Sequence, residues 1–281
     1  MSFHDLHSHS TASDGSLSPA QLVQAASAAG VGVLALTDHD STAGLAEAGA
    51  AAQSLGVRLI SAVEVSTTWN GKSVHIVGLN IDPACAELQR GLRRLQALRG
   101  ERALEMGRRL DQYGIPGVYE AARELAGEGM ITRTHFAHCL ARAGLAADVR
   151  DVFERYLTQG KPGYVSTQWA TLEDAVAWIR AAGGTAVVAH PQRYRLHGGW
   201  MRRLLAEFRE AGGAGLEVVS GTGGPGDVQS SAEYARRFDL LASVGSDFHG
   251  PEQVWPKLGR LAPLPPGLKP VWQTWEANDG G

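Results

Sequence analysis

Histidine and carboxylate residues recur in this sequence at short spacings that suit metal binding. His7 and His9 are separated by one residue, and so are Asp247 and His249. On a β-strand, this spacing directs both side chains to the same face. Imidazole nitrogens and carboxylate oxygens together suit zinc, manganese or iron, and neither cysteine has a second cysteine at metal-site spacing. The two pairs therefore indicate a metal centre.

Five further residues of the same two types extend this set to nine. They are Asp14, His39, Glu64, His75 and His190. Taken singly, each has an ordinary structural explanation: His75 fits a satisfied core histidine, and Asp14 fits the turn chemistry of Ser-Asp-Gly. Taken together, nine ligands exceed one tetrahedral site and fit two or three ions that share a bridging carboxylate.

The elements that must position these residues alternate between short β-like runs and longer helix-like runs, as in βαβ units around a parallel sheet. Helices are expected near 18–29, 41–54, 171–182, 200–211 and 227–238, and strands near 2–8, 33–37, 57–66, 73–80, 185–189, 215–219 and 242–246. Every expected strand except 215–219 carries or runs into one of these nine residues. Since barrel active sites form at the carboxyl ends of strands, we expect the nine side chains to meet at the mouth of an α/β barrel.

One segment, 84–168, interrupts this alternation and is expected to be helical throughout. It holds 13 basic and 10 acidic residues, whereas the rest of the chain holds 13 basic and 19 acidic residues. We therefore predict a mildly basic helical insertion domain that covers an acidic barrel formed by 1–83 and 169–281. A solvated helix face would produce the same charge run.

The composition sets outer limits on function. With 281 residues, 44% of them hydrophobic, the chain is long enough for one barrel with an insertion. A formal net charge of -3 argues against electrostatic binding of duplex nucleic acid over a broad surface. Only two cysteines are present, and no apolar run approaches the roughly 20 residues of a membrane span. The first residues lack the basic residues followed by an apolar run that are typical of a signal peptide. We expect a cytoplasmic protein without membrane association, and no protein partner is predicted.

The order of these motifs along the chain resembles the polymerase and histidinol phosphatase (PHP) family. The motifs are His7-Ser8-His9, Ser13-Asp14-Gly15, Thr37-Asp38-His39, Glu64, His75, Ala189-His190-Pro191 and Gly245-Ser246-Asp247-Phe248-His249. The resemblance implies a distorted (β/α)7 barrel and phosphoester hydrolysis. It also implies two or three divalent ions, most often Mn²⁺, with Zn²⁺, Fe²⁺ and Mg²⁺ as alternatives.

The resemblance further divides the ligands among three ions. The first ion would be held by His7, His9, Glu64 and Asp247. Glu64 would bridge to a second ion held by His75 and His190. The third would be held by Asp14, His39 and His249. Glu64 and Asp247 would then be catalytic, because a hydroxide that bridges two ions would attack phosphorus in line with the leaving oxygen.

The insertion is similar to that of one bacterial subgroup of the family, through Arg-Thr-His-Phe-Ala at 133–137 and Tyr-Leu-Thr-Gln-Gly-Lys-Pro at 156–162. That subgroup includes 3',5'-nucleoside bisphosphate phosphatases and enzymes that trim short RNA from its 5' end. The similarity implies removal of the 3'-phosphate from a nucleoside bisphosphate, which gives a 5'-nucleotide such as AMP plus phosphate. The alternative is 5'-3' hydrolysis of short 5'-phosphorylated RNA. Arg133 would bind a phosphate, His135 would bind a phosphate or protonate the leaving oxygen, and His197 is a third candidate for substrate contact.

Other functions are compatible with parts of the sequence. Gly-Thr-Gly-Gly-Pro-Gly at 221–226 matches a dinucleotide-binding motif, but neighbouring strands already provide metal ligands, so we expect a loop at the barrel mouth. Amidohydrolase barrels also begin with His-x-His, yet none of the four lysines lies where their carboxylated lysine would be. A barrel that only binds nucleotide or RNA is a third possibility, but such a degenerate site should have lost ligands.

Overall fold

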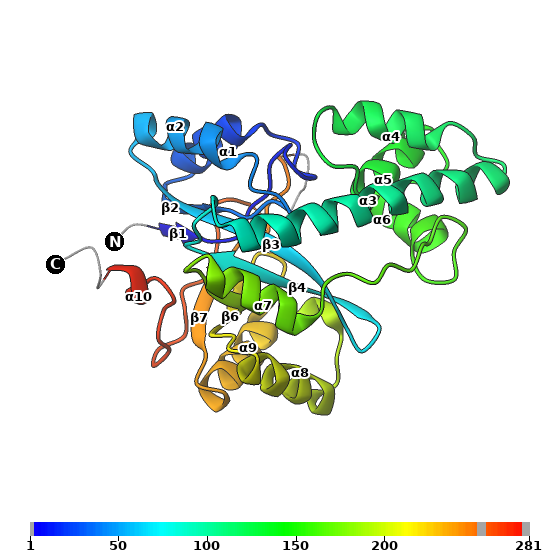
Figure 1. The fold of residues 1–281 in the computed structure, drawn as a ribbon. Helices are drawn as coiled ribbons and strands as arrows, with labels where there is room; N and C mark the ends of the chain where they lie inside the picture. The colour runs from blue at the N-terminus through cyan, green and yellow to red at the C-terminus, as the bar shows by residue number, and fades with distance from the viewer. Residues whose placement is uncertain (1–2, 252–256, 277–281) are drawn as a thin grey trace.

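The computed structural model describes residues 3–251 and 257–276. Its centre is a seven-stranded sheet whose strands lie side by side in chain order and form a nearly closed barrel (Figure 1). The strands are β1 (Phe3–Asp5), β2 (Val31–Leu36), β3 (Arg58–Trp69), β4 (Lys72–Leu79), β5 (Thr185–Val188), β6 (Gly215–Ser220) and β7 (Leu241–Gly245). The α/β barrel predicted from the sequence is therefore confirmed.

The barrel closes where the segment after β1 meets the segment after β7. The Leu6 amide donates to the Val244 carbonyl at 2.9 Å, and the Asp247 amide donates to the His7 carbonyl at 2.8 Å. β1 ends at Asp5, so His7, which the sequence placed inside a strand at 2–8, follows the strand, as His9 does. These hydrogen bonds hold the two His-containing segments next to each other.

The fourth strand runs in the opposite direction from the rest of the barrel. β3 and β4 form an antiparallel hairpin around the two-residue turn Asn70-Gly71, and both residues have positive φ, as a tight hairpin turn requires. β4 also pairs antiparallel with β5, whereas the remaining neighbours are parallel. His75 consequently reaches the barrel mouth from near the beginning of its strand.

Helices cover the outside of the barrel close to the predicted positions (Figure 1). They are α1 (Pro19–Ala28), α2 (Leu45–Leu55), α7 (Leu172–Ala181), α8 (Gly198–Glu210) and α9 (Pro225–Arg237), with a short α10 (Gln273–Glu276) near the end of the described chain. α1 begins as its sequence indicates, with a capping box between Ser18 and Gln21 and proline at its first position. Among the described helices, none has the length and apolar character needed to cross a membrane.

The insertion consists of four helices that extend from one side of the barrel (Figure 1). They are α3 (Ala86–Gln112), α4 (Val118–Ala126), α5 (Arg133–Arg142) and α6 (Val149–Val152), and α6 continues into a π-helical turn, η1 (Phe153–Leu157). These helices enclose a hydrophobic core of their own, which includes the fully buried Phe136. Residues 158–169 contain no helix, so the expectation of helix throughout 84–168 was wrong there. Gly160, Pro162 and Gly163 explain this, since glycine and proline disfavour helix interiors. The domain boundaries at 84 and 168 stay a prediction.

Candidate metal centre

The nine predicted ligands converge at the barrel mouth. Among the described residues, three groups of ligand-type side chains have donor atoms that all lie within 4.8 Å of one another. The groups are His7, His9, Glu64 and Asp247; His9, Asp14, His39 and His249; and His39, Glu64 and His75. His190 joins the last group through Glu64, whose Oε1 lies 3.0 Å from His190 Nε2.

Glu64 lies at the centre of the cluster and is fully buried. Its Oε1 lies 3.0 Å from His75 Nδ1, and its Oε2 lies 2.8 Å from His39 Nδ1. Burial alone would raise the pKa of this carboxyl, but His39, His75 and His7 hold the pKa well below its usual range. Because its two oxygens face different histidines, the ionised carboxylate is placed to bridge two cations.

The distances within the first group fit a shared ion. His7 Nε2 lies 3.4 Å from both Glu64 Oε1 and Asp247 Oδ1, and His9 Nε2 lies 3.1 Å from Asp247 Oδ1. Ligand atoms bonded at about 2.1 Å to one tetrahedral ion lie about 3.4 Å apart. His7 Nε2 and Glu64 Oε2 are buried, and neither makes a hydrogen bond within the described chain. Buried polar atoms are normally satisfied, so a cation is the partner that this group accommodates.

The second group joins the barrel to the insertion. Asp14 Oδ1 lies 3.4 Å from His249 Nε2 and 3.8 Å from His39 Nε2, while the Thr134 hydroxyl of α5 donates to Asp14 Oδ2 at 2.9 Å. Burial alone would lower the pKa of His249, but Asp14 and Asp247 raise it to about 9. The insertion therefore helps to orient one of the predicted carboxylate ligands.

Two predicted ligands have a backbone conformation that side chains rarely adopt. His190 has a φ of 27° and Asp247 a φ of 56°, both in the left-handed region. Such conformations persist where surrounding contacts hold them, and they concentrate at functional sites. Here they occur directly after β5 and β7, where the chain must turn sharply.

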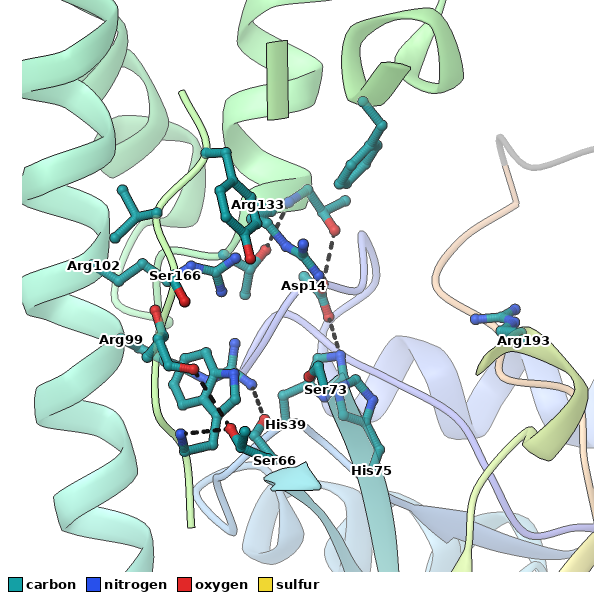
Figure 2. Close-up of a pocket in the computed structure, with 18 of the residues that line it drawn as sticks. Asp14, His39, Ser66, Ser73, His75, Arg99, Arg102, Arg133, Ser166 and Arg193 are labelled. Carbon is teal, nitrogen blue, oxygen red and sulfur yellow. Dashed lines mark hydrogen bonds and ion pairs between the residues drawn. The ribbon is translucent and has the colours of Figure 1, made fainter. Parts of the chain in front are cut away.

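A cavity of about 310 Å³ lies between the barrel mouth and the insertion. Its walls include predicted ligands, namely Asp14, His39, His75, His190, Asp247 and His249. Figure 2 shows Arg99, Arg102 and Arg133 on the insertion side of this cavity, with Arg193 on the opposite side. Arg193, in the short 3₁₀ helix η2 (Pro191–Tyr194), pairs with the Asp247 carboxylate. Cationic side chains thus flank the cluster on two sides.

The arginines on the insertion side differ in their partners. Arg99 forms a buried pair with Asp40 at 2.6 Å, whereas Arg102 and Arg133 form no ion pair among the described residues. Arg102 stacks on Trp169. Burial lowers the pKa of the Arg102 and Arg133 guanidiniums, and the positive charge of neighbouring arginines lowers it further. Two guanidiniums without a counter-ion form a ready binding site for an anion.

Sequence reasoning missed Glu217, which the fold brings to this site. β6 was the strand to which no ligand-type residue was assigned, yet Glu217 lies in it and contacts His7 Nδ1 through Oε2 at 2.6 Å. Asp38 accepts hydrogen bonds from the hydroxyls of Ser10 and Ser13, each at 2.6 Å, and so holds the loop that carries Asp14. For Glu217, the available signal was a single carboxylate inside an apolar strand.

The structure does not place all the predicted substrate-contacting residues of the insertion and of the loop after β5 in the cavity with the ligand cluster. Arg133 lines the cavity, but His135 and His197 do not. His135 accepts the Thr132 amide at 3.0 Å and faces a second cavity beside α1, while the ring of His197 lies 6.2 Å from Trp200. The roles predicted for these two histidines stay predictions, and Arg102 is the residue that the cavity presents with Arg133.

The barrel with one reversed strand and the clustered histidine and carboxylate side chains define a class of α/β barrel whose mouth fits metal ions. The chain belongs to the PHP domain family, whose model matches residues 5–185. It is 49% identical over 98% of its length to a 3',5'-nucleoside bisphosphate phosphatase of Chromobacterium violaceum, of which it covers 96%. It is also 46% identical to the 5'-3' exoribonuclease Rnm of Escherichia coli, over 97% of this chain and 94% of that protein. The solved structure of an amidohydrolase from Chromobacterium violaceum with bound sulfate and no metal superposes with a TM-score of 0.94 at 48% identity, covering 98% of this chain and 96% of that one. The predicted family is confirmed.

Proposed function

We propose that this protein is a metal-dependent phosphatase that removes the 3'-phosphate from 3',5'-nucleoside bisphosphates. One observation carries the proposal: the ligand cluster lines a cavity of about 310 Å³ together with two arginines that form no ion pair among the described residues. The cluster suits one phosphate, and the guanidiniums of Arg102 and Arg133 suit a second phosphate of the same small molecule. The nucleoside bisphosphate phosphatase of Chromobacterium violaceum, 49% identical, supports the choice of substrate.

The ligand set matches two or three divalent ions, with Mn²⁺ the first expectation and Zn²⁺, Fe²⁺ and Mg²⁺ the alternatives. When bound, such ions neutralise phosphate oxygens and lower the pKa of the attacking water. Glu64 and Asp247 would hold the ions. Arg193 is adjacent to Asp247 and is placed to contact the reacting phosphate. His135 stays the predicted proton donor for the leaving oxygen, which requires its ring to move into the cavity that holds the ligand cluster, because here it lines the second cavity instead.

Substrate comparison with the Mn²⁺-loaded protein tests the proposal. We expect phosphate release from adenosine 3',5'-bisphosphate to have a higher kcat/KM than release from 3'-AMP, because only the bisphosphate reaches both the cluster and the arginines. Arg133→Ala should remove this preference. Equal kcat/KM values for both nucleotides in the native protein would contradict the assignment of a second phosphate site.

A second candidate, 5'-3' hydrolysis of short 5'-phosphorylated RNA, is favoured by relatives named as 5'-3' exoribonucleases, in Haemophilus influenzae and Escherichia coli, each 46% identical. The same arginines would then hold the 5'-phosphate of the terminal nucleotide. Release of 5'-mononucleotides from a 5'-phosphorylated pentaribonucleotide, measured beside phosphate release from the bisphosphate, separates the two activities. Amide hydrolysis is less favoured, since none of the four lysines lines the cavity.

A further inference from the structure

Glu217 is a buried carboxylate with no assigned role. It lies in the middle of β6 between Leu216 and Val218 and is 2% exposed. Its Oε2 lies 2.6 Å from His7 Nδ1, and its Oε1 makes no hydrogen bond within the described chain. A buried carboxylate is costly unless a partner compensates it, and among the described residues Glu217 forms an ion pair with His7.

The contact with Glu217 determines which nitrogen of His7 faces the ligand cluster. His7 is 1% exposed, and its Nδ1–H donates to the carboxylate of Glu217. Nε2 is then the nitrogen directed at the cluster, 3.4 Å from Glu64 Oε1 and 3.4 Å from Asp247 Oδ1. Glu217 itself belongs to none of the three ligand groups found among the described residues. It therefore contacts a ligand without being one.

We propose that Glu217 is a positioning residue that tightens metal binding through His7. Its carboxylate fixes the Nδ1–H tautomer, prevents the ring from rotating and makes Nε2 a more basic ligand. The inference rests on the proposed metal binding but not on the identity of the substrate. Removal of such a partner typically weakens metal affinity by about 10- to 100-fold. The effect should fall on the ion shared by His7, His9, Glu64 and Asp247.

Titration of the metal-free protein with Mn²⁺, followed by electron paramagnetic resonance of the free ion, provides the test. Glu217→Gln keeps the size and a hydrogen-bond acceptor but removes the charge, and Glu217→Ala removes both. We expect one class of Mn²⁺ sites to weaken by roughly 10-fold in the first variant and by up to about 100-fold in the second. Glu233→Gln, an exposed glutamate on the neighbouring α9, is the matched control and should bind Mn²⁺ like the native protein. If Glu217→Gln fails to fold, Glu217→Asp, which keeps the charge but shortens the side chain, should show an intermediate affinity.

A double-mutant cycle separates action through His7 from a general structural role. Once His7→Gln has removed the ligand, adding Glu217→Gln should change Mn²⁺ affinity no further. Additive losses, or native affinity in Glu217→Gln, would overturn the role of Glu217. A native protein that binds no Mn²⁺ would instead contradict the proposed function, so the two failures are distinguishable.

Discussion

Replacement of Arg102 by methionine should reduce activity on the bisphosphate without weakening the fold. Arg102 has no carboxylate partner among the described residues, and its charge lies near those of Arg99 and Arg133. Methionine keeps an apolar side chain of similar length against Trp169 but cannot bind phosphate. A charge-assisted hydrogen bond to phosphate contributes about 1.5–3 kcal/mol. Its loss corresponds to a decrease of roughly 10- to 100-fold in kcat/KM for adenosine 3',5'-bisphosphate.

The same substitution gives a second, independent readout in thermal unfolding. Breaking a buried ion pair typically costs about 3–5 kcal/mol, but Arg102 forms no such pair among the described residues, and its buried Nε makes no hydrogen bond there. We therefore expect the Tm of the metal-free variant to change by less than about 3 °C. Arg108→Ala, on the same helix and paired with Glu105 at the surface, is the control and should leave both Tm and kcat/KM unchanged. A large fall in Tm, or equal losses on the bisphosphate and on 3'-AMP, would refute the reasoning.

Three further predictions concern the metal cluster. The protein purified without chelator should carry more than one equivalent of transition metal by elemental analysis, and a metal-free protein with full phosphatase activity would exclude the proposed chemistry. Glu64→Gln should nearly abolish kcat, because a neutral amide cannot bridge two cations, while the circular dichroism spectrum should match that of the native protein. A native kcat in this variant would show that Glu64 is not the bridge. Metal binding at pH 7 should release protons, because acidic neighbours raise the pKa of His7 and His39, and that of His249 to about 9, despite burial. These imidazoles are protonated below their pKa, so the affinity for metal should rise with pH up to about 9. Calorimetry of metal binding in buffers of different ionisation enthalpy measures the number of protons released. Binding heats that do not depend on the buffer would contradict this prediction.

The residue types and their order along the chain were sufficient to predict the barrel and the convergence of nine ligand-type side chains at its mouth. This worked because parallel strands bring their carboxyl ends to one edge, so a ligand that follows a strand is placed by topology alone. His39, His190 and Asp247 all follow strands in this way. The i,i+2 pairs were a second local signal, since residues at that spacing share a face of extended chain. Asp247 has a left-handed backbone, so for the pair Asp247 and His249 this reason does not hold and the turn after β7 sets their placement.

Tertiary structure decided the features that depend on packing between distant segments. His75 reaches the site only because β4 runs antiparallel to its neighbours. No local pattern in the sequence of a strand predicts the direction in which it runs relative to the neighbouring strands. Glu217 becomes a partner of His7 through the curvature that brings β6 close to the segment after β1. Arg102 faces the cavity, while His135 turns toward Thr132, because the docking of α3 and α5 on the barrel sets which helix face points inward. Helical periodicity groups residues on a face, but only packing selects the neighbour that each face contacts.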